Sequence, residues 1–111
     1  MKVILTETAD DCLWMIWDRD RLYSEDVAEE FQRDIDHFIR DAISENPEIG
    51  HVWHAPRGIR RLIFRRRHNI FYTLRENVAW VLFIFDGRMN INQDIAEAGL
   101  DVEALIDQSN R

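Results

Sequence analysis

Eight consecutive residues from Val78 to Phe85 are apolar, and no other feature of the sequence restricts the fold as strongly. A run of this length, rich in β-branched and aromatic residues, predicts a strand that is buried on both faces at the middle of a sheet. Two alternating runs precede it, Gly58 to Phe64 and Asn69 to Leu74. Turn signals at Glu76-Asn77 and Asp86-Gly87 bound the last run. The stretch therefore predicts an antiparallel meander of three strands.

The residues before the meander predict a short strand and two helices. Lys2 to Thr6 alternates as a strand does, and Thr6 or Thr8 is suited to cap a helix that runs to about residue 22. A second helix is expected to begin after Ser24 and to end at Asn46-Pro47, because proline disfavours helical backbone at the residue before it. We expect the two helices to form a hairpin that lies on the sheet. The apolar stripe of the second helix consists of Val27, Phe31, Ile35, Phe38 and Ala42, flanked by Ile39 and Ile43.

The remaining segments are a loop and a tail. Pro47 to Pro56 reads as one long loop, and its two histidines, His51 and His54, are too few for a metal site. No metal or other cofactor is therefore predicted. Residues 91–111 predict an acidic helical tail interrupted at Gly99. The expected fold is α+β, with one domain at residues 1–90 and the tail at residues 91–111.

Charge is distributed unevenly along the chain. The net charge is -7, and residues 1–50, 51–90 and 91–111 contribute -9, +6 and -4. The acidic total argues against unspecific binding to nucleic acid, whereas the central segment allows a local anionic partner. The run Arg65 to Arg67 is interpreted either as a solvated loop or as part of a binding site. The acidic tail is expected either to close an edge of the sheet or to lie over the basic segment.

Signals for export or membrane insertion are lacking in the sequence. No apolar run approaches the roughly 18 residues that a membrane span requires. The first residues lack the apolar core of a signal peptide. The single cysteine, Cys12, excludes an intrachain disulfide. A cytoplasmic protein is the expectation.

Two tryptophans in the first helix lie off its core stripe. Ala9, Leu13 and Ile16 form that stripe, which leaves Trp14 and Trp17 on another face. They are expected either to pack over the neighbouring helix or to form an aromatic patch for a protein partner.

The order of these elements resembles the RelE/ParE superfamily of bacterial type II toxins. Roughly residues 1 to 90 carry the resemblance, which implies a toxin that a cognate antitoxin protein neutralises and which is compatible with a homodimer. The motifs that carry it are the helical pattern from Val27 to Ile43, Pro47-Glu48-Ile49-Gly50, Gly58-Ile59-Arg60-Arg61-Leu62, Ile70-Phe71-Tyr72 and Phe83-Ile84-Phe85-Asp86-Gly87-Arg88.

The superfamily has two branches, and the resemblance implies different activities for them. RelE-like members cut messenger RNA on the ribosome, for which Arg61, His68 and Arg88 are the catalytic candidates. ParE-like members, among them plasmid stabilisation proteins, bind and inhibit DNA gyrase. The middle strand carries Asn69 where RelE-like members have arginine, and no tyrosine follows Arg88. These departures favour the ParE-like branch, without enzymatic activity.

The ParE-like interpretation implies two binding surfaces. One is a target-binding rim of arginines, and the other is a groove on the helical hairpin that receives an acidic, partly disordered antitoxin segment. A RelE-like endoribonuclease is the alternative, and a non-toxic family remnant or protein-interaction domain is the second alternative. The target-binding candidates are Arg60, Arg61, Arg65, Arg66, Arg67 and Arg88, and the antitoxin-binding candidates are Trp14, Trp17, Phe31 and Phe38.

Overall fold

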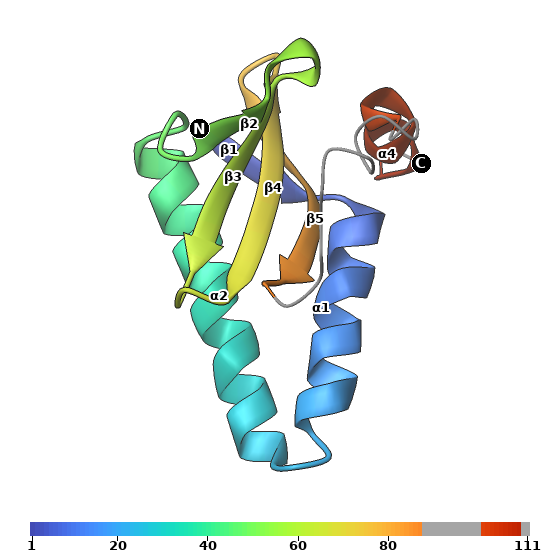
Figure 1. Cartoon of the computed structure of the whole chain (residues 1–111). Helices are drawn as coiled ribbons and strands as arrows, with labels where there is room; N and C mark the ends of the chain where they lie inside the picture. The colour runs from blue at the N-terminus through green and yellow to red at the C-terminus, as the bar shows by residue number, and fades with distance from the viewer. Residues whose placement is uncertain (88–100, 110–111) are drawn as a thin grey trace.

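The computed structural model describes residues 1–87 and 101–109 and confirms the predicted α+β fold (Figure 1). An N-terminal strand and two long helices precede an antiparallel meander, and a short helix follows. The strands are β1 (Lys2–Leu5), β2 (His51–His54), β3 (Ile59–Phe64), β4 (His68–Arg75) and β5 (Val78–Asp86); the helices are α1 (Glu7–Asp20), α2 (Glu25–Glu45) and α4 (Val102–Ser109), and a 3-10 turn, η1, covers Ala55–Arg57.

The sheet has five strands in the order β1-β5-β4-β3-β2, with β1 parallel to β5 and the other pairs antiparallel. Strand β5 lies between β1 and β4, and all its residues from Ala79 to Ile84 are buried, as the apolar run predicted. The alternation of β5 side chains between the two faces of the sheet changes at Leu82. Because Phe71 faces Phe83 while Tyr72 faces Val81, Leu82 is an extra residue that forms a β-bulge.

The predicted loop from Pro47 to Pro56 is wrong in its second half, since His51–His54 forms the edge strand β2. His51 pairs with Arg61 and Val52 with Arg60 across the antiparallel β2–β3 pair. A strand of four residues carries too weak a periodicity to be separated from a loop by sequence alone. Pairing with β3 supplies the stabilisation that the local sequence does not show.

Helices α1 and α2 form the predicted hairpin and cover one face of the sheet (Figure 1). Thr6 caps α1 by accepting a hydrogen bond from the amide of Ala9 at 3.1 Å, and Ser24 caps α2 by accepting from the amide of Val27 at 3.3 Å. Val27 was expected in the apolar stripe but is 57% exposed. The buried side chains of α2 are Ala28, Phe31, Ile35, Ile39 and Ile43.

The tail was expected at a sheet edge or over the basic segment. Helix α4 packs on the sheet face opposite the hairpin and meets one arginine of the basic segment, Arg75. Its Val102 and Ile106 join a second apolar cluster with Trp80 of β5. Glu103 pairs with Arg75 at 3.3 Å, and within residues 101–109 no ion pair reaches the Arg65 to Arg67 run. Residues 94–98 of the predicted helical tail lie outside the described residues.

In the described part of the chain, none of the helices combines the length and apolar character needed to cross a membrane.

Candidate functional site

The sheet face opposite the hairpin holds a guanidinium group that has no hydrogen-bond or ion-pair partner among the described residues. Arg61 faces Phe71 on β4 and His51 on β2, and residues opposite one another in an antiparallel pair share a face. The Trp53 ring lies on the same side, 4.7 Å from the Phe71 ring. Arg61 is half-buried and makes no hydrogen bond or ion pair with the described residues. We call His51, Trp53, Arg61 and Phe71 the sheet-face site.

An aromatic row extends from this site across the sheet. Phe71 lies 4.8 Å from Phe83, and Phe83 lies 5.0 Å from Phe85. Phe71 and Phe83 are buried, whereas Trp53 and Phe85 are only partly buried. A guanidinium beside aromatic rings is a common element of surfaces that bind proteins or nucleic acids. His51 and Trp53 were not predicted as site residues because their strand has the turn-rich surroundings of a loop, and the Val-Trp pair, typical of strands, was the one signal for it in the sequence.

Three other predicted target-binding arginines are engaged within the protein. Arg60 donates through Nη1 to the carbonyls of Glu48 and Gly50, at 3.2 and 2.8 Å. Arg65 pairs with Asp34 and lies over the Phe64 ring, with Cζ 4.8 Å from the centroid. Arg67 pairs with Asp86. These three arginines therefore support the β2–β3 side of the fold and the β3–β4 turn.

Arg66 lies at the tip of the β3–β4 turn, where it is exposed and makes no ion pair with the described residues. Arg65 and Arg66 have φ angles of 52° and 60°, and the amide of Arg67 donates to the carbonyl of Phe64 at 3.2 Å. These values define a type I′ hairpin turn, which favours Asn and Gly at both central positions. The turn thus holds two arginines in a left-handed backbone conformation that is costly for them.

The two described members of the predicted nuclease set, Arg61 and His68, are not brought together. His68 faces Phe64 across the β3–β4 pair, and its ring lies 4.7 Å from that of Phe31 on α2. It therefore points toward the helices, whereas Arg61 points to the other face of the sheet. His68 is 5% exposed, and neither ring nitrogen has a hydrogen-bond partner among residues 1–87 and 101–109. Arg88, the third candidate, lies outside the described residues.

Burial lowers the pKa of His68 below its usual value, and the Arg67 and Arg19 guanidiniums add to this effect. The Asp86 carboxylate opposes it but does not reverse it. A buried, neutral imidazole that is separated by the sheet from Arg61 is not placed to take a proton from a substrate on the sheet-face site. The role of His68 as a base beside Arg61 is therefore not supported by the geometry.

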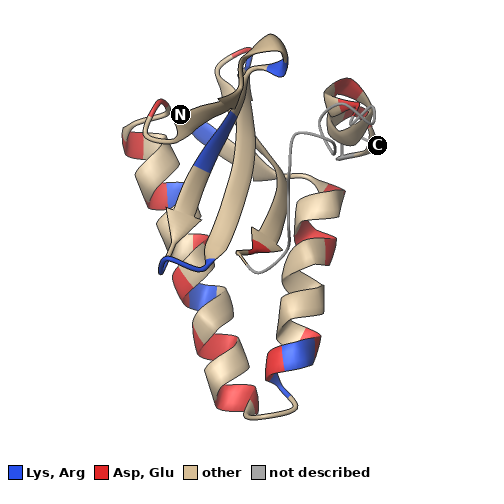
Figure 2. Ribbon diagram, viewed as in Figure 1, with Lys and Arg blue, Asp and Glu red and all other residues tan. Residues whose placement is uncertain are grey.

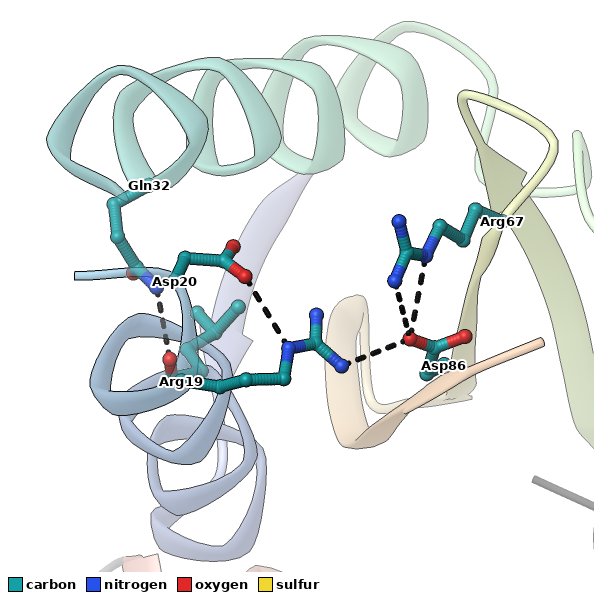
Figure 3. A network of polar contacts seen from close by, with 6 residues as sticks. Arg19, Asp20, Gln32, Arg67 and Asp86 are labelled. Carbon is teal, nitrogen blue, oxygen red and sulfur yellow. Dashed lines mark hydrogen bonds and ion pairs between the residues drawn. The ribbon is translucent and has the colours of Figure 1, made fainter. Parts of the chain in front are cut away.

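Asp86, near the end of β5, joins three segments of the chain (Figure 3). Arg19 of α1 donates to its Oδ2 at 3.0 Å, and Arg67 donates to the same oxygen through Nε and Nη2 at 3.3 and 3.2 Å. Arg19 also donates to Asp20 at 3.2 Å. Because the Asp86 side chain is largely buried, the pair of arginines compensates its charge.

The Pro47-Glu48-Ile49-Gly50 motif is built around the buried Tyr72. The tyrosine hydroxyl donates to the carbonyl of Pro47 at 2.7 Å and accepts from the amide of Gly50 at 2.9 Å. A Cβ atom on Gly50 would lie 2.7 Å from Cε1 of Tyr72 and 3.0 Å from the carbonyl oxygen of Arg61. The motif therefore has a structural role, since it fixes the entry into β2 beside the sheet-face site.

The antitoxin-binding candidates divide into two groups. Phe31 and Phe38 pack against Phe64, with ring centroids 5.9 and 4.9 Å away, and Phe31 is buried. Both rings therefore pack between α2 and the sheet, and Phe38 is only partly buried. Trp14 is 63% exposed, and with Trp17 it lines a pocket on the hairpin surface. We call the residues that line it, Trp14, Trp17, Glu29, Gln32 and Arg33, the tryptophan pocket.

His54, the second histidine of the predicted loop, accepts a hydrogen bond through Nδ1 from the amide of Arg57 at 3.3 Å and so caps η1. Among residues 1–87 and 101–109, no three histidine, cysteine or acidic side chains are grouped as a metal ion would require.

No protein-family model matches the chain, and no curated protein matches it.

Proposed function

We propose that this protein is the toxin of a bacterial type II toxin–antitoxin system, that it belongs to the ParE-like branch, and that it binds and inhibits DNA gyrase. The observation that carries the proposal is the sheet-face site. Arg61 is held there beside the aromatic rings of Trp53 and Phe71 and makes no hydrogen bond or ion pair within the described chain. Leaving a half-buried guanidinium unpaired costs stability, which suits a residue that is reserved for a partner.

The arrangement of elements supports the same proposal. A strand, a helical hairpin and a meander follow one another in the order that the resemblance implies. The hairpin covers one face of the sheet and leaves the sheet-face site on the other. In this proposal the sheet-face site and Arg66 contact the target, and the tryptophan pocket on the hairpin contacts the antitoxin.

The direct test uses purified protein, DNA gyrase, ATP and supercoiled plasmid. Trapping of gyrase on broken DNA should yield linear plasmid after denaturation and proteolysis. Arg61→Ala should reduce this yield in a graded way, whereas Lys2→Ala, which removes the same charge from an exposed position at the start of β1, should not. Unchanged supercoiling and no linear product at micromolar protein would refute the proposed target.

A RelE-like endoribonuclease is the second candidate, because one observation favours it. His51 is exposed and lies directly across from Arg61, so an imidazole and a guanidinium share the sheet-face site. A base and a cation in this arrangement suit attack by a 2′-hydroxyl group on a phosphate. Cleavage of ribosome-bound messenger RNA that is lost in His51→Ala would support this candidate against the gyrase proposal.

A further inference from the structure

The tryptophan pocket has a volume of about 480 Å³ and lies between α1 and α2. Its aromatic walls come from Trp14 and Trp17, whose rings lie 5.7 Å apart with an angle of 77° between their planes. Because the rings are nearly perpendicular, a side chain that binds in the pocket contacts the face of one ring and the edge of the other. Trp14 remains 63% exposed, which is unusual for so large an apolar side chain.

The pocket is held in shape by a contact between the helices. Gln32 of α2 donates through Nε2 to the backbone carbonyl of Leu13 on α1 at 2.8 Å (Figure 3). Leu13 itself is buried in the core, so this contact fixes one helix relative to the other beside the two tryptophans. A preformed pocket loses less conformational entropy when it binds a guest.

The helical hairpin that carries the pocket is strongly negative overall. The hairpin, residues 7–45, contains thirteen aspartates and glutamates and four arginines, which gives -9. Three of these arginines are paired with aspartates of the hairpin: Arg19 with Asp20, Arg21 with Asp18, and Arg40 with Asp36. Figure 2 shows the acidic residues along both long helices, whereas the meander and its turns carry most of the basic ones.

One tryptophan of the pocket already holds a cation. The Cζ atom of Arg21 lies 5.4 Å from the centroid of the Trp17 ring, within the range of a cation–π contact. Trp14 has no such contact among the described residues, and Glu29 supplies a carboxylate on the pocket lining. Arg33, one turn after Glu29, also lines the pocket and opposes a bound cation, so the attraction of a cation depends on Glu29 and on the acidic residues of the hairpin around it.

We propose that the tryptophan pocket receives the side chain of a lysine or arginine from a basic segment of a protein partner. The aliphatic stem packs against the indole rings and the cationic head lies near Glu29. The proposal rests on the proposed function in one respect, since the partner is the antitoxin that this function implies. It changes the chemistry of that partner: the segment seated on the hairpin is basic, whereas an acidic segment was expected from the sequence.

The test is a titration of the ¹⁵N-labelled full-length protein, followed through the four indole N–H signals. The probe is a hexalysine peptide, and the matched control is the same peptide with every side chain acetylated. Hexalysine should shift the signals of Trp14 and Trp17 but not those of Trp53 and Trp80. Equal shifts with the acetylated peptide, or no shift with either peptide, would overturn the proposal.

Variants separate the pocket from the general charge of the hairpin. Glu29→Gln and Trp14→Leu should each weaken hexalysine binding about two- to fivefold, the range for an exposed cation contact. Glu45→Gln removes the same charge about 24 Å along α2 and should have little effect. Equal weakening by Glu29→Gln and Glu45→Gln would mean unspecific attraction and would overturn the proposal. This titration requires no toxicity, so its failure is distinguishable from failure of the proposed function.

Discussion

The side chains of Arg61 and His68 lie on opposite faces of the same sheet. Arg61 faces Phe71 and His51 across its neighbouring strands, whereas His68 faces Phe64 and contacts the ring of Phe31 on the hairpin. The two residues therefore cannot act together on one bound phosphate. This separation assigns them different physical roles, and each role predicts a different outcome on substitution.

Replacing Arg61 by alanine should impair target binding without unfolding the protein. Arg61 has no intramolecular hydrogen bond or ion pair among the described residues, so its loss leaves no buried group unpaired. Growth inhibition should weaken in Arg61→Ala, and the melting temperature should stay within the range of a surface substitution. Equal growth inhibition by Arg61→Ala and the wild type would show that this guanidinium does not contact the target.

Replacing His68 by phenylalanine should stabilise the protein, and more so in acid. The wild type buries two ring nitrogens that have no hydrogen-bond partner in the described part of the chain, which costs on the order of 1–3 kcal/mol. The pKa of His68 is lowered in the folded state, so the unfolded chain binds a proton as the pH falls below about 6.5 while the folded chain does not. Stability of the wild type is therefore lost below this pH.

Urea denaturation at pH 7.5 and pH 5 measures this effect. The difference in unfolding free energy between His68→Phe and wild type should grow at pH 5. The exposed His37 supplies the control, because His37→Asn should show no such growth. A constant difference between the two pH values would contradict a neutral buried imidazole.

Adding a methyl group at Gly50 should destabilise the fold through Tyr72. The new Cβ atom would lie 2.7 Å from Cε1 of a tyrosine that is fully buried and hydrogen-bonded on both sides. Overpacking of this kind costs about 1–3 kcal/mol. Thermal unfolding of Gly50→Ala should show a lower melting temperature, and the double variant Gly50→Ala with Tyr72→Leu, which removes Cε1, should lose less than the sum of the two single variants. Additive losses would exclude a clash with the tyrosine.

Replacing Arg66 by glycine should raise stability and weaken target binding. Its φ of 60° is costly for arginine but not for glycine, and removing the left-handed strain yields about 1 kcal/mol. The comparison is Arg67→Gly, which removes two hydrogen bonds to Asp86 and should destabilise the protein. A lower melting temperature in Arg66→Gly would mean that the strain is absent or that Arg66 has a structural contact.

The parts of the fold that the sequence predicted are those with strong local signals. The central strand β5 follows from its unbroken apolar run, and both helix starts follow from Thr6 and Ser24. The edge strand β2 was missed because four residues between two prolines have no clear periodicity. The bulge at Leu82 was not predicted either, since it depends on how β5 pairs with β4.

The candidate site was predictable only in part. The alternation of side chains along β3 correctly predicts that Arg60 and Arg61 point to opposite faces of the sheet. It does not tell which of the two faces the helices cover. The ion pairs of Arg65 with Asp34 and of Arg67 with Asp86 join residues far apart in sequence. The sequence therefore did not indicate that these two arginines are engaged within the protein. Strand β4 also begins one residue earlier than predicted, which placed His68 inside the sheet.

The measurement that most directly tests the proposed function is induced expression in a bacterium that carries a DNA-damage reporter, with growth followed in parallel. A ParE-like toxin should arrest growth and raise the reporter strongly, because trapped gyrase leaves broken DNA. Arg61→Ala should reduce both signals together. Growth that continues unchanged, or arrest with an immediate fall in protein synthesis and no reporter signal, would contradict the proposal that this protein poisons gyrase.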